Sequence, residues 1–284
     1  MHPFFQHYLP QQLLSRFVGL LANSKIDLIK NLLIKYFTKL YPVNMTEAEI
    51  EDPYAYKTFN QFFTRKLKPS LRLIVPAINA LASPCDGTIY QRGNIEDCCL
   101  LQAKGSLFTI QDLLGAKINH NVFNNGAFIN IYLSPTDYHR VHMPVTGTLQ
   151  QMDYIPGKLF SVNNTTVKYI PNLFARNERV VNIFQTEFGT IAIILVGAML
   201  VGSIKTTWAG TINATHSKKP YSIHYPTSSN NPVNINKGQE MGMFQMGSTV
   251  IVLLENKEII WDPDLTTNKK VLMGQKLGSF NHSY

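Results

Sequence analysis

Short β-rich segments dominate the chain after Pro76 and constrain its fold more than any other feature of the sequence. Runs of β-branched and aromatic residues alternate there with Gly, Asn and Pro, at 87–93, 127–135, 147–155, 179–200 and 247–256. Runs of this length and spacing are typical of a mostly antiparallel β domain. The longest apolar stretch, Ile191 to Gly202, is well short of the ~20 residues that cross a bilayer, so we predict a buried strand there.

Glycine and asparagine mark the expected turns between these runs. Asn-Asn-Gly at 124–126 and Phe-Gly-Thr at 188–190 are predicted to join neighbouring strands. The polar segment from Thr215 to Asn236 holds few core residues, and we expect a surface loop there.

The N-terminal part has a helical periodicity instead. From Leu13 to Leu40, apolar residues recur at helical spacing with lysines among them. Asn23-Ser24 divides this segment into two expected helices, the second capped by Ser24, and a short third helix is expected around Tyr56 to Leu67. Two compatible interpretations remain open. The helices pack on the β domain, or their apolar face enters a lipid interface with the lysines among anionic headgroups.

These patterns predict an α+β fold, with a helical, membrane-associating segment at 1–70 and a β-rich domain at 71–284. The net charge of +8 and the pI of about 9.3 favour an anionic partner, which could be nucleic acid, an acidic lipid surface or an anionic substrate. Recognisable nucleic-acid modules are missing, as are a phosphate loop and an HExxH zinc helix. The three cysteines have neither disulfide-framework nor zinc-finger spacing, which favours a reducing compartment.

Two segments could carry chemistry. In SPTDYHRVHMP (134–144), His139 and His142 lie three residues apart beside Asp137 and Arg140, in a loop that leaves a predicted strand. Such a loop can present an imidazole as a base near neutral pH, although two histidines at this spacing are often structural or could share a metal. The second segment, KGQEMGMFQMGSTVIVLLEN (237–256), taken alone predicts only a turn that enters an apolar strand.

Together with other segments these two resemble the phosphatidylserine decarboxylase family, whose proenzymes carry a Leu-Gly-Ser-Thr self-cleavage motif. The similar segments follow one another in the family's order: FNQFFTRKLKP (59–69), SPCDG (83–87), YLSPTDYHRVHMP (132–144), PGKLFSVN (156–163), LFARNERV (173–180), VGSIKTTWAG (201–210) and KGQEMGMFQMGSTV (237–250). Met246 stands where the family usually has Leu, which is a mild change of similar volume.

The resemblance implies a catalytic triad of Asp86, His142 and Ser248 and cleavage of the Gly247-Ser248 bond. His142 would act as the base for the Ser248 hydroxyl, and Asp86 would hold the tautomer of its ring. Cleavage would give a large chain, 1–247, and a small chain, 248–284, that stay together as a heterodimer. Ser248 would become a covalent pyruvoyl cofactor that forms a Schiff base with the substrate amine. His139 is the candidate for substrate contact or proton transfer, and no residue suggests a required metal.

The resemblance further implies decarboxylation of phosphatidylserine to phosphatidylethanolamine by an enzyme bound peripherally to the cytoplasmic face of the cell membrane. A homodimer of the processed unit is a further expectation, and no nucleic-acid partner is expected. Membrane contacts are expected from the helices between Leu13 and Leu40, and also from the following residues: Phe59, Phe62, Phe63, Arg65, Lys66 and Lys68. Two alternatives stay open: a pyruvoyl-dependent decarboxylase of a soluble amino acid, and a non-catalytic membrane-peripheral protein.

Overall fold

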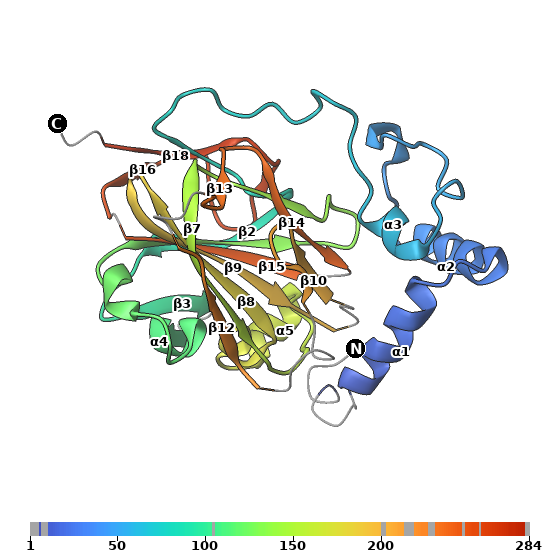
Figure 1. Ribbon diagram of the computed structural model, residues 1–284, viewed down its shortest axis with the longest axis horizontal. Helices are drawn as coiled ribbons and strands as arrows, with labels where there is room; N and C mark the ends of the chain where they lie inside the picture. Colours follow the sequence, from blue (N-terminus) through green and yellow to red (C-terminus); the bar gives the residue numbers. More distant parts are fainter. Residues whose placement is uncertain are drawn as a thin grey trace.

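The molecule consists of a β-rich body, with the N-terminal helices grouped at one end and further short helices against the body (Figure 1). The computed structural model describes residues 6, 11–103, 106–199, 203–212, 219–226, 231–245, 248–255 and 257–281. The strand pairs between its named strands are antiparallel, which confirms the predicted α+β class with mostly antiparallel strands.

A nine-stranded central sheet organises the β body. Its strand order is β12-β7-β8-β9-β15-β5-β2-β17, and β13 pairs with β7 in addition. The bounds are β2 Gly87–Asn94, β5 Ala127–Leu133, β7 Gly147–Ile155, β8 Arg179–Thr186, β9 Gly189–Gly197, β12 Tyr221–His224, β13 Asn234–Ile235, β15 Ser248–Leu254 and β17 Lys270–Val271. Every residue of β15 is buried, because this strand lies in the middle of the sheet between β5 and β9.

Smaller sheets and short helices cover the two faces of the central sheet. Side chains of two small sheets join the core on one face. These sheets are β11-β10-β14-β6 (Gly210–Ile212, Ser203–Thr206, Glu240–Gln245, Arg140–His142) and β1-β18-β16 (Ala80–Ala82, Lys276–Phe280, Ile259–Trp261). On the other face the core includes the hairpin β3-β4 (Cys99–Ala103, Ser106–Thr109) and the helices α4 Ile110–Leu114, α5 Asn164–Tyr169, α6 Leu173–Arg176 and η3 His120–Phe123.

The strand predictions were mostly correct, and the turn predictions were only partly so. The apolar stretch from Ile191 forms buried β9, and residues 200–202 lie outside the described part. The turn near 188–190 does join β8 to β9. The turn at 124–126 is wrong as predicted, because it follows η3 and leads into β5 without a strand directly before it. The expected loop at 215–236 is also partly wrong, because β12 and β13 pair there with the edge strand β7.

Among the described residues, the α-helices α1 Gln11–Ala22, α2 Asp27–Leu40 and α3 Phe59–Phe63 precede the β body, with the short 3-10 helix η2 Met45–Glu47 between α2 and α3. The predicted break at Asn23-Ser24 is confirmed, but Ser24 is not the capping residue. Helix α2 starts two residues later than predicted, with Ile26 as the N-cap, and the Ile26 N–H donates to Ser24 Oγ at 3.2 Å.

Aromatic residues of α3 form a small core of their own with α2. Phe59, Phe62 and Phe63 are 4%, 0% and 1% exposed and pack around Phe37. The expectation that these three rings contact the membrane surface is therefore wrong. Arg65 is also buried and donates from Nη2 to Thr136 O at 3.0 Å, so its expected contact with headgroup phosphates is wrong too.

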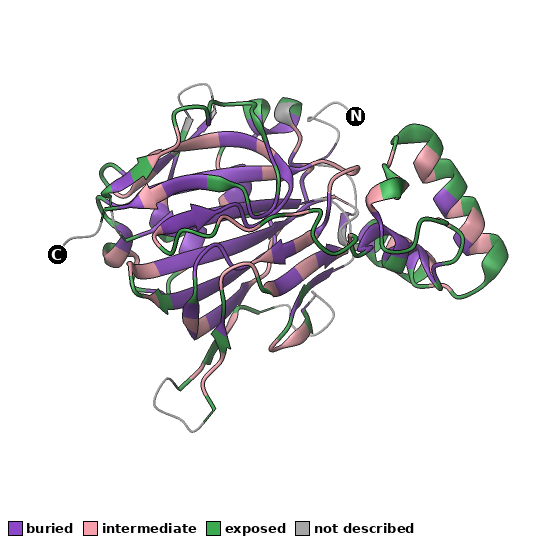
Figure 2. Ribbon diagram, turned by 90° about the horizontal axis from the view of Figure 1, so that it is seen from above, coloured by how far each residue is buried: buried purple, intermediate pink, exposed green. Residues whose placement is uncertain are grey.

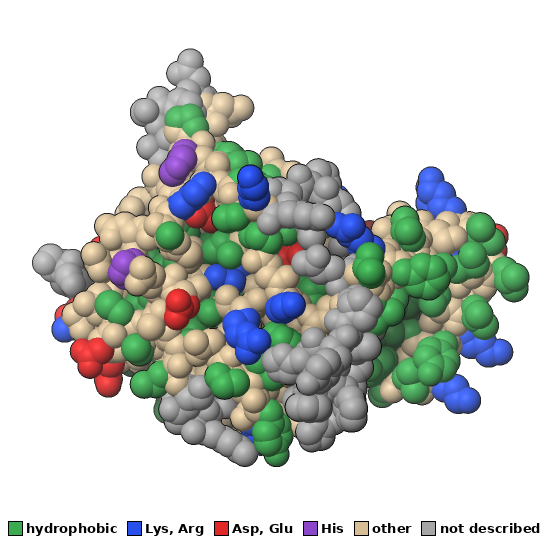
Figure 3. Space-filling model, turned by 90° about the horizontal axis from the view of Figure 1, so that it is seen from below, with side chains coloured by type: hydrophobic (Ala, Val, Ile, Leu, Met, Phe, Trp, Pro, Cys, Tyr) green, Lys and Arg blue, Asp and Glu red, His purple; other side chains and the backbone are tan. Residues whose placement is uncertain are grey.

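The outer face of α1 and α2 is apolar and exposed (Figure 2). Leu20, Leu28 and Leu32 are 74%, 79% and 66% exposed, and Leu13, Phe17, Tyr36 and Leu40 are exposed with them. Figure 3 shows hydrophobic side chains gathered over this end of the molecule with cationic ones around them. The described helices include none that is both long enough and apolar enough to cross a bilayer.

Candidate active site

Ser248 opens β15, at the point where the chain enters the central sheet from β14 in the smaller sheet. Its register partners are Leu133 at the end of β5 and Gly197 at the end of β9. The side chain is fully buried, and its hydroxyl oxygen has no hydrogen-bond partner among the described residues. Met246 and Gly247, which hold the rest of the predicted cleavage motif, lie outside the described residues.

The histidine loop and the Asp86 segment converge on the same end of β15. The loop leaves β5 after Leu133, the partner of Ser248, and continues into β6. His142 donates its backbone N–H to Pro84 O at 2.8 Å, which places it beside the segment that carries Asp86. The backbone oxygen of His139 accepts from Phe244 N at 3.0 Å on β14. The structure thus brings all four predicted side-chain positions to one region.

Hydrogen bonds at both nitrogens define the state of the His142 ring. Nδ1 lies 2.8 Å from Gly238 O, and since a carbonyl can only accept, Nδ1 carries the proton. Nε2 lies 3.1 Å from Tyr138 Oη, which therefore donates to it. Burial lowers the pKa of His142, so the ring is neutral near pH 7 with a basic Nε2.

Asp86 does not make the contact that the sequence comparison implied. Its carboxylate accepts from Arg72 Nε at 3.0 and 3.1 Å, from Arg72 Nη2 at 2.6 Å and from Met273 N at 2.8 Å. The tautomer of His142 is held instead by Gly238 O. The expectation that Asp86 itself fixes this ring by a hydrogen bond is therefore wrong for this structure, although its negative charge acts on His142 through space.

His139 is completely buried and has one free ring nitrogen. Nδ1 donates to Asp137 O at 2.8 Å, and Nε2 has no partner in the described part of the chain. Burial lowers the pKa of His139 to about 3, so the ring stays neutral. Phe63 of α3 lies against it, with ring centroids 4.1 Å apart. A neutral imidazole with a free lone pair at Nε2 can accept a hydrogen bond or a proton.

Helix α3 and the residues after it hold this histidine loop in place. Arg140 donates from Nε to Thr64 O at 2.9 Å and forms an ion pair with Glu240 at 2.8 Å. Arg65 donates to Thr136 O from the same side. Sequence reasoning did not find Tyr138, Gly238 or Arg72. Tyr138 lies within the histidine motif and was within reach of that reasoning, whereas Arg72 lies in no recognised segment.

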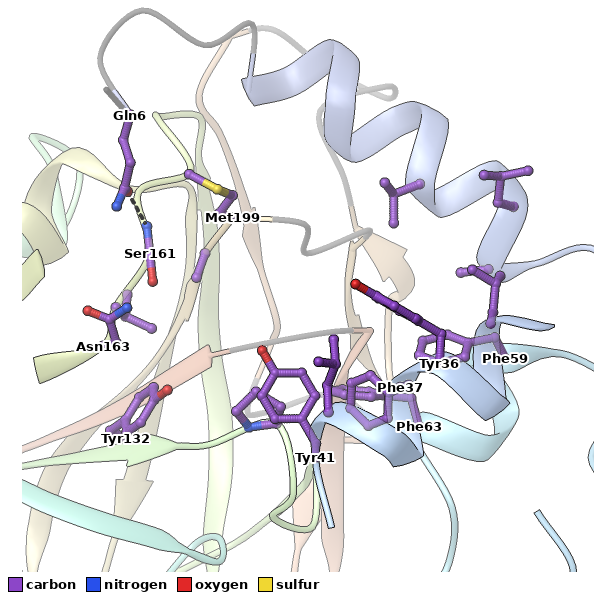
Figure 4. A pocket seen from close by; sticks show the side chains of 18 residues that line it. Gln6, Tyr36, Phe37, Tyr41, Phe59, Phe63, Tyr132, Ser161, Asn163 and Met199 are labelled. Carbon is purple, nitrogen blue, oxygen red and sulfur yellow. Dashed lines mark hydrogen bonds between the residues drawn. The ribbon is translucent and has the colours of Figure 1, made fainter. Parts of the chain in front are cut away.

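An apolar cavity of about 630 Å³ separates the helices from the central sheet (Figure 4). Phe37 of α2, Tyr41 directly after it and Phe63 of α3 line one side, and Tyr132 lies across from them. The cavity reaches the start of β15 on the face of the sheet that carries Thr249, because the lining residue Tyr132 pairs with Thr249, whereas Ser248 belongs to the opposite face with Val250. In the described residues, no three His, Cys, Asp or Glu side chains are grouped as metal ligands would be.

Comparison with known proteins gives one consistent answer. The family model described as phosphatidylserine decarboxylase matches residues 59–279, and a model described as PSD matches residues 4–42. A phosphatidylserine decarboxylase proenzyme of Ectopseudomonas mendocina is 48% identical over 275 residues, which is 96% of each chain. A proenzyme of the same name from Marinobacter nauticus is 48% identical over 278 residues, 97% of this chain and 96% of its own. The chain therefore belongs to the phosphatidylserine decarboxylase family.

Proposed function

We propose that this chain is a proenzyme that cleaves itself between Gly247 and Ser248 and then decarboxylates phosphatidylserine to phosphatidylethanolamine. The observation that carries the proposal is the position of Ser248. Its buried hydroxyl has no partner among the described residues, and it lies at the end of β15 toward which the segments that carry His142 and Asp86 converge, in a chain of this family.

In the proposed cleavage, His142 takes the proton of Ser248 Oγ, and Tyr138 must release Nε2 for this to happen. The oxygen attacks the Gly247 carbonyl carbon, so an ester replaces the peptide C–N bond and the nitrogen becomes an amine. Loss of the Ser248 Cα proton then breaks the Cβ–O bond and releases Gly247 as the carboxyl end of the large chain. Water displaces the nitrogen of the dehydroalanine as ammonia and leaves a pyruvoyl group.

The small chain, 248–284, would remain bound after this cleavage. Strand β15 pairs along its whole length with β5 and β9 of the large chain. Strands β17 and β18 pair with β2 and β1, which also belong to the large chain. These interleaved ladders support the proposed heterodimer and a catalytic domain at 71–284 made from both products. The homodimer stays a prediction from the resemblance.

For decarboxylation, the site has the features that a pyruvoyl group at Ser248 needs. Such a group supplies an electrophilic carbonyl that captures the substrate amine and accepts the electron pair released as carbon dioxide leaves. The buried position of Ser248 excludes bulk water from that carbonyl. We propose that His139, neutral and with a free Nε2, contacts the substrate or moves the proton that replaces the lost carboxylate. The apolar cavity would admit the lipid from the helical side.

The exposed apolar face of α1 and α2 supports a peripheral membrane role for residues 1–70. Its leucines can enter the interface while Lys25, Lys35 and Lys39, all exposed, meet anionic headgroups. Lys66 and Lys68 are exposed and remain candidates for phosphate contact. The cytoplasmic face of the cell membrane stays part of the proposal.

Replacing both Leu28 and Leu32 with glutamine is expected to weaken binding to vesicles containing phosphatidylglycerol by about tenfold or more, because a buried leucine contributes about 1.5–3 kcal/mol. Vesicle sedimentation measures the effect, and the melting temperature should not change, since both side chains are exposed. Leu73→Gln is the matched control, because Leu73 is 78% exposed but lies outside the helices. Equal binding by the double variant and the wild type would remove this face from the proposal.

The proposed function is tested by the intact mass of the purified protein under denaturing conditions. We expect two chains, with the 248–284 fragment lighter by one ammonia than its sequence requires. Phosphatidylserine in mixed micelles should then be converted to phosphatidylethanolamine. A single chain of 32.1 kDa without activity contradicts the proposal. Release of carbon dioxide from free serine at a comparable rate would favour a decarboxylase of soluble amino acids instead.

A further inference from the structure

Arg72 forms the closest charged contact of the candidate site. Its side chain is 10% exposed and that of Asp86 is 6% exposed. The guanidinium donates to both oxygens of the Asp86 carboxylate, through Nε at 3.0 and 3.1 Å and through Nη2 at 2.6 Å. This forked contact fixes the plane of the carboxylate as well as its charge.

Glu47 holds the same guanidinium from the helical side. Its Oε2 accepts from Arg72 Nη2 at 2.6 Å, and its side chain is 35% exposed. Glu47 lies in the short helix η2, Met45–Glu47, which follows α2. Two backbone hydrogen bonds, Lys68 N to Glu47 O and Glu49 N to Lys66 O, fasten this turn to the segment that leads into Arg72. The guanidinium therefore joins the helical segment to the Asp86 segment.

Asp86 lies among groups of both signs, and Arg72 is the cation in direct contact with it. The titratable and charged groups that act on Asp86, or lie in its cluster, are Glu47, Arg65, Arg72, Cys85, Asp137, Tyr138 and His142. Asp137 and Glu47 are acidic, and burial raises the pKa of Asp137. Without Arg72, the buried carboxylate would face these acids with one hydrogen bond from the described residues, which comes from Met273 N. Desolvation and like charge both destabilise a carboxylate in such a position.

We propose that Arg72 is a positioning residue for self-cleavage, which holds the Asp86 carboxylate in a fixed plane beside the His142 segment, and that Glu47 anchors the guanidinium. The inference rests on the proposed function, because it assumes that the Asp86 charge stabilises the protonated His142 ring formed during cleavage. Arg72 itself touches neither Ser248 nor the substrate in this scheme. Lysine at this position would keep the positive charge but not the paired hydrogen bonds to the carboxylate, and glutamine would remove both.

The test is the pH dependence of self-cleavage in the full chain. Proenzymes are made by cell-free synthesis, chilled on ice and then transferred to buffers from pH 5.5 to 9. The amount of small chain formed over time is measured by intact mass. We expect Arg72→Gln to slow cleavage at pH 6.5 by about tenfold or more, and the rate to recover toward higher pH. The acid limb of the pH profile should lie at higher pH than that of the wild type, because the positive charge that faces the site is lost. The acid limb of Arg72→Lys should lie between those of the wild type and Arg72→Gln.

Glu51→Gln is the matched control, because it removes the exposed Lys68–Glu51 pair, and its profile should overlay that of the wild type. The inference is overturned if the pH profile of Arg72→Gln overlays that of the wild type. It is also overturned if the cleavage rate of the variant is lower than the wild-type rate by the same factor at every pH. If circular dichroism shows that Arg72→Gln is unfolded, the pH profile of Arg72→Lys decides. An acid limb at higher pH than that of the wild type supports the inference, and an acid limb that overlays the wild type overturns it. The proposed function fails separately, if the wild type never cleaves or if Asp86→Asn cleaves at the wild-type rate.

Discussion

Replacing Ser248 with alanine is expected to leave one uncleaved chain of 32.1 kDa with no decarboxylase activity. The variant loses the only atom that can attack the Gly247 carbonyl in the proposed scheme, so the effect should be complete rather than partial. Intact mass under denaturing conditions measures it directly. The fold should survive, because the lost hydroxyl has no hydrogen-bond partner among the described residues, and its removal therefore breaks no described contact.

Thr249→Val provides a matched control for this result. Thr249 is also fully buried with a hydroxyl that has no partner among the described residues, but alternation along β15 turns it to the opposite face of the sheet. It shares that face with Ile251, whereas Ser248 shares its face with Val250. The control should still give two chains. Two chains from Ser248→Ala would show that another residue is the nucleophile and would end the proposed mechanism.

The sequence predicted those parts of the fold that depend on local pattern. Short runs of β-branched and aromatic residues between Gly, Asn and Pro predicted the strands β5, β7, β8, β9 and β15, and helical spacing predicted α1 and α2 with their break at Asn23-Ser24. Burial was harder to predict, because an aromatic residue on a short helix fits a protein core and a lipid interface equally well. Phe62 was assigned to lipid from its sequence context, and only the packing of α2 against α3 shows that it is buried.

The site was predictable as a set of residues but not as a set of contacts. Asp86, His142 and Ser248 were found through family motifs, and the structure brings their segments to one region. The partner of each side chain depends on chain segments far away in the sequence. Gly238 lies 96 residues from His142, and no local pattern signals that its carbonyl holds the ring. Arg72 was missed for the same reason, since its role follows from a contact with Asp86, 14 residues further along the chain and beyond strand β1.

The two histidines are expected to separate the two reactions of this chain. His142, whose Nε2 is basic and whose segment runs beside that of Asp86, is proposed to act in cleavage, so His142→Ala should remain a single chain. His139 is anchored through Nδ1 and has a free Nε2, which suits it to the later step on the substrate. To test whether the two histidines act in different reactions, a variant of His139 is needed that still cleaves itself normally.

His139→Asn is the sharpest variant for this purpose. The asparagine Nδ2 can replace the donor to Asp137 O, so the loop keeps its anchor while the nitrogen at the Nε2 position is lost. We expect two chains with the pyruvoyl mass and a kcat for phosphatidylserine lowered by about 10²–10⁴-fold, the usual contribution of general acid–base catalysis. KM should change little, because the cavity walls stay in place. An uncleaved His139→Asn chain would move His139 into the cleavage step, and full activity would remove it from both reactions.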